Sequence, residues 1–251
     1  MDVLLNNLNS IWTISLILAA CVALPSGIIQ GYAGFGGALV AVPFLAILFD
    51  PVTGFAMILF VVLFGQGTHF FKAAKSADWH EVGPVAAASS FTMTIGILFL
   101  VASDPTFIRK CMGIIIILIT LLMASNWSYT GKRGLTGKLF TGGFSGAITG
   151  GFGVPGFPLQ VMYFHSSSST VEMKRANVLA ALACGLVVAI TGLLIQSVYT
   201  QEMLIRAVII APTFIFGAKL GQMIFKVAPA DWFRKVTYII LFATALMLLF
   251  L

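Results

Sequence analysis

Residues Ser26 to Gly37 read SGIIQGYAGFGG, and residues Ser145 to Gly156 read SGAITGGFGVPG. The two segments lie 119 positions apart and are identical at six of twelve positions. Further along, Arg109-Lys110 matches Arg234-Lys235 at an offset of 125. A slowly growing offset is what a duplication followed by small insertions leaves behind. The chain is therefore predicted to contain two diverged copies of one unit.

The composition predicts an integral membrane protein. Of the 251 residues, 59% are hydrophobic and 9% are charged, whereas soluble domains carry about 25% charged residues. Three scattered cysteines suggest no disulfide set, and we expect no metal and no cofactor. The charges are also segregated, so that every uncharged run reaches the roughly 20 residues that cross a bilayer as a helix. These runs are residues 3–49, 82–103, 111–131, 139–165 and 176–201.

Both halves share one predicted architecture, that of an all-α polytopic membrane protein. Each half reads as a glycine-rich segment followed by three long apolar helices. We place the N-terminal repeat at residues 1–127, a cytoplasmic linker at 128–137 and the C-terminal repeat at 138–251, all within one integral membrane domain. The six helices are expected at residues 53–71, 84–102, 108–127, 175–197, 204–224 and 232–250.

The positions of the basic residues distinguish two topologies. If each glycine-rich segment crosses the membrane once, the 14 Lys and Arg residues divide eight to six between the two sides. If each segment enters and leaves on the same side, they divide eleven to three, with Arg109, Lys110 and Arg206 apart from the rest. Because cytoplasmic loops are rich in Lys and Arg, we favour the second topology, which puts the linker in the cytoplasm and both termini outside it.

The glycine-rich segments are accordingly predicted to be re-entrant hairpins of two short helices. Only 27 residues separate Lys138 from Ser166, which is enough for two helices of about 12 residues but not for two full spans. Three crossings after each hairpin make the two repeats inverted relative to each other, as in many secondary transporters. The two hairpin tips would then approach from opposite faces of the membrane.

Broken helices inside a membrane are candidate binding sites, because irregular backbone persists there only where protein, water or substrate satisfies its polar groups. The clusters Gly34–Gly37 and Gly153–Gly156 each precede an apolar run, so the first N–H groups of the following helix would point into the break. Such helix ends attract anions. Glycines four residues apart, such as Gly27 and Gly31, are instead typical of close helix packing.

We expect the substrate site where the two glycine breaks meet, near the middle of the membrane. Backbone N–H groups would hold an anion, and the side chains of Gln30, Thr149 and Gln160 would add hydrogen bonds, with a packing hydrogen bond as the alternative for each. No catalytic residue is expected, because acidic residues and histidines do not cluster at depth. The predicted substrate site comprises Gln30, Gly31, Gly34, Phe35, Gly36, Gly37, Thr149, Gly150, Gly153, Val154, Gly156 and Gln160.

The residues that follow the first glycine cluster carry a family resemblance. Residues 34–43, GFGGALVAVP, resemble the glycine-rich segment of the TauE/SafE family of sulfite and organosulfonate exporters, which ends in an apolar stretch and a proline. The second copy, residues 150–158, is looser and has Pro155 where a glycine is expected. Proline lacks the N–H donor that glycine supplies. The resemblance covers nearly the whole chain and implies transport of a small sulfur-containing or organic anion.

Together these features predict a secondary transporter of such an anion, of the sulfite, sulfonate or thiosulfate class, that works by alternating access. An anion channel is the alternative, followed by an intramembrane enzyme or a structural membrane protein. The expected partners are the anion, the lipid bilayer and a coupling proton or ion, for which His69 is a candidate. The net charge of +6 reflects topology rather than nucleic-acid binding. We expect a multi-pass protein of the bacterial inner membrane, with its oligomeric state left open.

Overall fold

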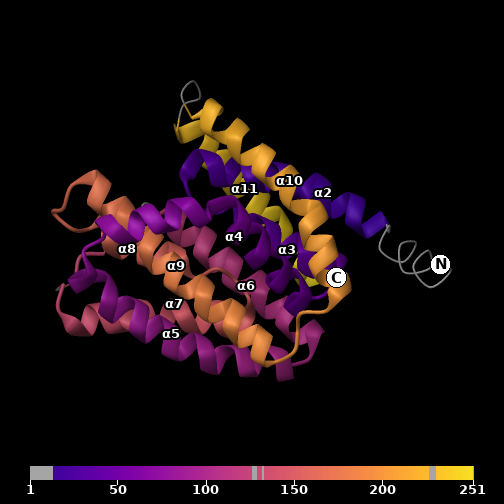
Figure 1. Ribbon diagram of the computed structural model, residues 1–251, viewed down its shortest axis with the longest axis horizontal. Helices are drawn as coiled ribbons and strands as arrows, with labels where there is room; N and C mark the ends of the chain where they lie inside the picture. Colours follow the sequence, from indigo (N-terminus) through magenta and orange to yellow (C-terminus); the bar gives the residue numbers. More distant parts are fainter. Residues whose placement is uncertain (1–13, 126–128, 132, 226–229, 251) are drawn as a thin grey trace.

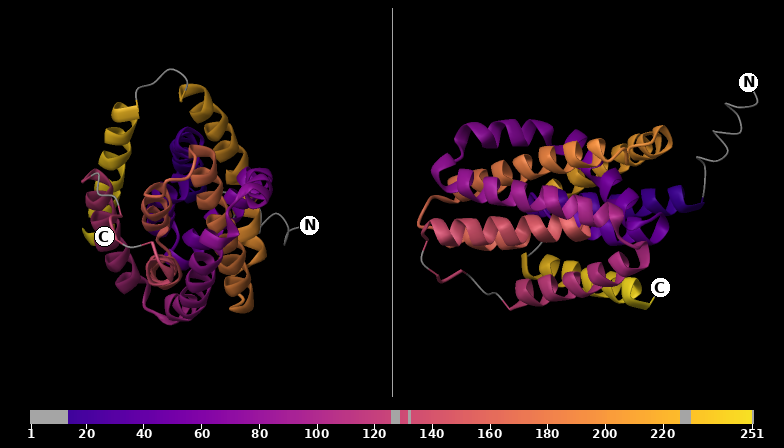
Figure 2. Two further views of the ribbon diagram at one scale, coloured as in Figure 1. Left: turned by 90° about the vertical axis from the view of Figure 1, so that its left-hand side faces the viewer. Right: turned by 90° about the horizontal axis from the view of Figure 1, so that it is seen from below.

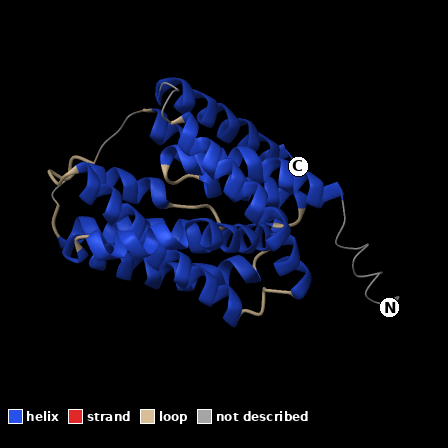
Figure 3. Cartoon of the chain, turned by 45° about the horizontal axis from the view of Figure 1, so that its top comes forward, coloured by secondary structure: helices blue, strands red, loops and turns tan. Residues whose placement is uncertain are grey.

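The chain folds into helices throughout the residues that the computed structural model describes, which are 14–125, 129–131, 133–225 and 230–250. Figure 3 shows helices and loops but no strand in this part of the chain. Six of the described helices are long and apolar enough to cross a membrane, which confirms the predicted polytopic fold. The helix α4 is a seventh candidate, and it bends by 69° between Pro51–Gly67 and His69–Ser76.

Within the described residues, each half contributes five helices in the same order: a pair on either side of the glycine break and then three long helices (Figure 1). The first half comprises α2 (Ile14–Ala33), α3 (Gly37–Leu48), α4 (Pro51–Ser76), α5 (Trp79–Ala102) and α6 (Pro105–Ala124). The second half comprises α7 (Leu135–Phe152), α8 (Phe157–His165), α9 (Val171–Ile195), α10 (Gln201–Ile224) and α11 (Ala230–Phe250).

The long helices begin two to five residues before their predicted starts, because polar capping residues precede the apolar runs. The carboxylates of Asp50, Asp78 and Asp104 accept hydrogen bonds from backbone N–H groups in the first turns of α4, α5 and α6. The hydroxyls of Thr170 and Thr200 do the same for α9 and α10. Each such cap stabilises a helix by about 1 kcal/mol, so each helix begins at its capping residue, a few positions before the apolar run.

The arms of the two hairpins are unequal, and the prediction of two helices of about 12 residues is wrong for the second half. There α7 has 18 residues and α8 has nine, while α2 has 20 and α3 has 12. α7 begins at Leu135, inside the predicted linker of residues 128–137; residues 126–128 and 132 lie outside the described part. Lys138 lies within α7, and its ammonium pairs with the Glu81 carboxylate of α5 at 3.0 Å.

The two halves interlock through two reciprocal helix pairs. α2 of the first half packs on α10 of the second, and α5 of the first half packs on α7 of the second; these are the most extensive pairings between helices. A Cβ atom at Gly27 or Gly31 would overlap a carbonyl oxygen of α10, and one at Gly142, Gly146 or Gly150 would overlap a carbonyl oxygen of α5. These glycines therefore allow close helix packing, as their four-residue spacing predicted.

The partners in each reciprocal pair run in the same direction. Gly27 and then Gly31 of α2 meet Phe214 and then Ala218 of α10, and the glycines of α7 meet successive residues of α5 in the same way. The right-hand view of Figure 2 shows long helices aligned along the bundle. The helices of each pair, α2 with α10 and α5 with α7, are therefore parallel.

The bases of the two hairpins lie at opposite ends of the bundle. Arg109, in the first turns of α6, and Arg206, near the start of α10, both reach Phe49 at the end of α3. Arg109 does so through a hydrogen bond to the Phe49 carbonyl, and Arg206 through a contact with the Phe49 ring. At the other end, Arg133 ahead of α7 donates to the Tyr163 carbonyl at 2.6 Å and to the Ser166 hydroxyl at 2.8 Å. Each second arm thus returns to the end at which its first arm began.

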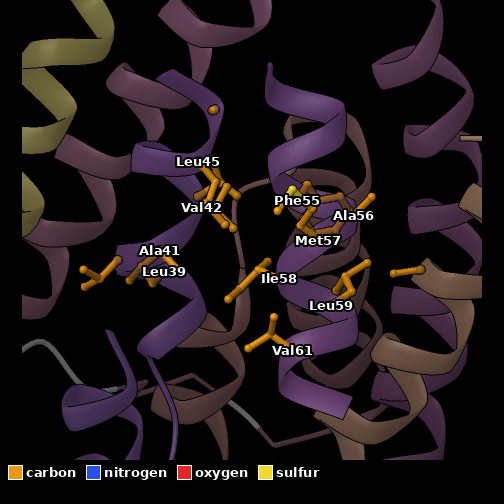
Figure 4. Close-up of a cluster of buried hydrophobic side chains, with 14 of the residues drawn as sticks. Leu39, Ala41, Val42, Leu45, Phe55, Ala56, Met57, Ile58, Leu59 and Val61 are labelled. Carbon is orange, nitrogen blue, oxygen red and sulfur yellow. The ribbon is translucent and has the colours of Figure 1, made fainter. Parts of the chain in front are cut away.

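The apolar core lies between α3, α4 and the long helices of both halves. Val42 and Leu45 of α3 pack with Phe55 and Ile58 of α4, and all four are at most 2% exposed (Figure 4). In contrast, large apolar side chains such as Phe91 are 70% exposed on the outside of the bundle. An apolar exterior of this kind is what a surface in contact with lipid requires.

Candidate functional site

The glycine breaks of the two hairpins share one backbone geometry. Gly34 and Gly36 have φ angles of 82° and 102°, and Gly153 has a φ of 66°, in the left-handed region that glycine adopts without strain. The N–H groups of Gly34 and Gly153 donate to carbonyls four residues earlier, at 2.9 and 3.0 Å. These residues are equivalent in the repeat, so both breaks begin with the same turn.

A polar side chain closes each break from the preceding helix. The Gln30 Oε1 atom accepts from the Gly37 N–H at 2.8 Å, and the Thr149 Oγ1 atom accepts from the Gly156 N–H at 2.9 Å. The Gln30 amide also donates to the Gly34 carbonyl at 3.3 Å. Gln30 and Thr149 therefore cap the second arms of their own hairpins, which is the packing alternative left open for them.

One further backbone donor at each break is free in the described part of the chain. The N–H groups of Ala38 and Phe157, one residue after the capped glycines, have no hydrogen-bond acceptor there. Unpaired donors are expected in the first turn of a helix, and both residues line a cavity. Two equivalent helix starts thus border the same space.

This central cavity occupies about 760 Å³, counting its mouth, and lies between the two hairpins, α4, α5 and α9. Its walls are mainly apolar and aromatic, including Phe35, Phe55, Phe70, Met93 and Phe157. None of its lining residues is Asp, Glu, Lys, Arg or His. A ligand here would meet apolar walls and neutral hydrogen-bonding groups rather than a fixed charge.

The polar groups of the central cavity gather around Gln160. Its Nε2 atom donates to the Ser145 hydroxyl at 3.0 Å and lies 3.5 Å from the Ser89 hydroxyl. Gln160 is 4% exposed, and its Oε1 atom has no partner in the described structure. A buried polar atom without a partner is costly, so this pole of the cavity is suited to a ligand or water that completes the hydrogen bonds.

A second, charged hollow of about 1190 Å³, counting the open space at its mouth, adjoins the first glycine break, and we call it the vestibule. Its lining includes Gln30 and Gly34 of the first hairpin, Lys72 of α4 and Arg175 of α9. Gln30 also lines the central cavity, so this side chain lies at the junction of the two spaces. The vestibule lies near the end of the bundle where α5 and α9 begin. Glu172 and Arg175, near the start of α9, line it, and the Asp78 N–H, just ahead of α5, donates to Asn177 of α9 at 2.8 Å.

The flanks of the two breaks differ in what they border. A Cβ atom at Gly34 would lie 3.3 Å from the Arg175 guanidinium, and Gly34 lines the vestibule. A Cβ atom at Gly153 would lie 3.3 Å from the Phe55 side chain, Gly153 lines neither hollow, and Val154 beside it is 0% exposed. We call Gly153 and Val154 the closed flank. Equivalent positions of the two repeats therefore face a charged hollow in the first copy and apolar packing in the second.

The structure brings half of the predicted site residues together in one cavity. Gln30, Phe35, Gly36, Thr149, Gly156 and Gln160 line the central cavity. Gly31 and Gly34 line only the vestibule. Gly37, Gly150, Gly153 and Val154 line neither space, since Gly37 packs on its own hairpin, Gly150 packs on α5, and Gly153 and Val154 belong to the closed flank.

Sequence reasoning missed the two serines beside Gln160 and most of the apolar wall. Ser145 opens the second copy of the repeated motif and aligns with Ser26, so the repeat itself carried a signal. Ser89 is one of two adjacent serines in a long apolar run, where a hydroxyl usually faces the bundle interior. Neither the repeat nor residue polarity distinguishes Phe55 and Met93 in the sequence, because only the packing of α4 and α5 brings them to the cavity.

Long apolar helices around two broken hairpins and a buried cavity define a polytopic membrane protein built for transport. The chain belongs to the TauE/SafE family, described as "Sulfite exporter TauE/SafE", whose family model matches residues 18–248. Members of this family are transporters rather than enzymes. No curated protein and no solved structure matches the chain.

Proposed function

We propose that the protein carries a small sulfur-containing or organic anion across the membrane by alternating access, and that the anion binds in the central cavity. The observation that carries this proposal is the meeting of both glycine breaks at one cavity whose polar pole, at Gln160, has an unpaired buried atom. Ala38 and Phe157, whose N–H groups have no acceptor in the described part of the chain, line the same cavity. Neutral donors of this kind bind anions at helix starts.

The lining of the cavity favours an anion with a single charge and an apolar part. The cost of removing an ion from water grows with the square of its charge, and the central cavity offers no cation to offset it. The aromatic walls stabilise an organic body by removing it from water. A short sulfonate or a monoprotonated oxyanion fits these conditions better than a dianion.

We further propose that the two halves are inverted repeats with the vestibule facing the cytoplasm. Support comes from the parallel pairs α2 with α10 and α5 with α7, and from the hairpin bases at opposite ends. Arg109 and Arg206 lie at one end, whereas Arg133, Lys138 and Arg175 lie at the other. The end with more basic residues is expected in the cytoplasm, which puts both chain termini outside.

The closed flank supports a carrier rather than a channel. A channel needs one continuous path, but Gly153 lies beside the side chains of Phe55 and Leu100 and lines neither hollow, whereas its equivalent Gly34 lines the vestibule. A repeat pair in which one copy is open and the other is packed is what alternating access requires in a single state. Exchange of the two arrangements would open the opposite face.

Counterflow in proteoliposomes tests this proposal. Vesicles loaded with unlabelled anion should take up labelled anion faster than empty vesicles, because a carrier returns faster when it is loaded. The panel should contain sulfite, thiosulfate, short alkanesulfonates and carboxylates. No uptake of any member would refute transport of this class of anion, and uptake without stimulation by internal anion would favour the channel.

The site itself is tested by Gln160→Leu, which removes the polar pole and keeps the size of the side chain. We expect the affinity for the transported anion to fall by about tenfold or more, since a hydrogen bond to a charged group contributes about 1.5–3 kcal/mol. The matched control is Gln196→Leu, which changes the residue that follows α9 and lines neither hollow. Equal affinities for the two variants would exclude Gln160 from the site.

A further inference from the structure

The vestibule contains cations that the central cavity lacks. Lys72 and Arg175 line it together with His69, and Glu172 is its only acidic lining residue. Neither Lys72 nor Arg175 forms an ion pair with another described residue. Their charges are therefore not neutralised by a direct partner, and the hollow between α4 and α9 has an excess of positive charge.

The vestibule also has amides that can orient a ligand. Gln66 of α4 and Gln222 of α10 line the vestibule together with Gln30, and Gln66 is 9% exposed. Arginine binds sulfonate-like and carboxylate groups through two parallel N–H donors, and amides add neutral donors beside it. The Arg175 guanidinium lies beside Gly34, 3.3 Å from the position that a Cβ atom would take there, so its charge borders the first glycine break.

The other repeat has no equivalent set of charges. At an offset of 121, at which Glu81 matches Glu202, Lys72 corresponds to Leu193 and Arg175 corresponds to Gly54. Leu193 is 0% exposed, and Gly54 packs against the backbone of Leu45 in α3. A mirror-image vestibule built from the second repeat would therefore be apolar, so the attraction for anions exists at one end of the bundle only.

We propose that the vestibule is a second anion-binding site, in which Arg175 and Lys72 hold a small oxyanion before it passes Gln30 into the central cavity. This inference rests on the proposed transport function and adds to it a side-specific loading step. Basic clefts raise the local concentration of anions and their association rates by about 10- to 1,000-fold, and the effect weakens as salt is added. Loading is thus favoured from the vestibule end and not from the other.

Right-side-out and inside-out membrane vesicles give the two faces separately. With a labelled short alkanesulfonate or sulfite, Arg175→Gln and Lys72→Gln should each raise the KM from the vestibule face by about tenfold. They should leave the KM from the opposite face within about twofold of the wild type. The salt dependence of the vestibule-face KM should also become shallower.

Two neighbouring lysines provide matched controls. Lys174→Gln and Lys75→Gln remove the same charge from the same helices, but neither residue lines the vestibule, so both should behave as the wild type. Arg175→Lys, which keeps the charge, should recover part of the lost affinity and guards against a folding defect. If all the glutamine variants behave alike, or if both faces change equally, the vestibule is not a loading site. If the wild type moves no anion at all, the proposed transport function fails instead.

Discussion

Replacing Thr149 by valine removes the acceptor that closes the second glycine break while keeping the shape of the side chain. The Thr149 hydroxyl accepts from the Gly156 N–H at 2.9 Å, and Gly156 is buried. The hydroxyl also donates to the Ser145 carbonyl at 2.9 Å, which lies within α7 and can still accept a helical N–H. The main consequence is therefore a buried N–H without an acceptor at the start of α8.

A buried donor left without a partner costs about 1–3 kcal/mol. That energy shifts the equilibrium from the native start of α8 toward a displaced start by a factor of roughly 5 to 150. Because α8 carries Gln160 and the Phe157 N–H, displacement of its start misplaces the polar pole of the central cavity. We expect Thr149→Val to lower the affinity for the transported anion within this range, and to lower the unfolding temperature in detergent.

The assay compares anion affinity, obtained from ligand-dependent thermal shifts, with the counterflow rate in proteoliposomes. Thr149→Ser keeps the hydroxyl and should stay close to the wild type in both. If Thr149→Val binds and transports as the wild type does, the capping hydrogen bond does not hold the site together. If the serine variant is as impaired as the valine variant, the methyl group of Thr149 matters rather than its hydroxyl.

Three other substitutions on the cavity walls and helix contacts have defined outcomes. Gly185→Ala adds a methyl group 3.5 Å from the Met93 side chain at the cavity wall, so longer alkanesulfonates should lose affinity relative to methanesulfonate. The control Gly83→Ala, whose methyl group points into open space, should leave the relative affinities of these sulfonates unchanged. Gly146→Ala would overlap the Ser89 carbonyl of α5 and should destabilise the fold by about 1–3 kcal/mol. The control Gly143→Ala places its methyl group 3.7 Å from Thr92 and should be tolerated, so equal unfolding temperatures for the two variants would contradict the packing argument. Phe55→Ala opens the closed flank at Gly153 and should make anion uptake independent of internal anion. Phe64→Ala on the outer surface, where Phe64 is 61% exposed, should keep the stimulation; stimulated uptake in both variants would show that Phe55 is not a seal.

The helical architecture could be predicted because it depends on local sequence. Uncharged runs of membrane length and a repeated glycine motif are visible without any contact information, and the structure has helices at each predicted place. The helices begin earlier than predicted because capping residues such as Asp78 precede the apolar runs. Asp78 with Glu81 three residues later is a recognisable start signal in the sequence. Boundaries of this kind can be improved from sequence alone.

The site could be predicted only where the repeat marked it. Both glycine breaks were located, but the hydrogen bonds from Gly37 to Gln30 and from Gly156 to Thr149 join residues seven positions apart across an irregular turn, and no helix or strand periodicity predicts such a pair. Ser89 and Phe55 reach the cavity from α5 and α4 through packing between halves. Their sequence positions have no fixed relation to the glycine motif.

The differences between the two repeats are as informative as their likeness. Gln30 and Thr149 perform the same capping role with different groups, yet Gln30 reaches both the vestibule and the central cavity, whereas Thr149 reaches only the cavity. Cations border the first break and aromatic packing borders the second. A duplication gives two equivalent halves, and selective change in the residues around each break then makes the two faces of the membrane unequal for an anion. In a passive carrier such asymmetry changes the affinity on each side without changing the equilibrium, so the direction of net transport would depend on the anion gradient and on any coupled ion.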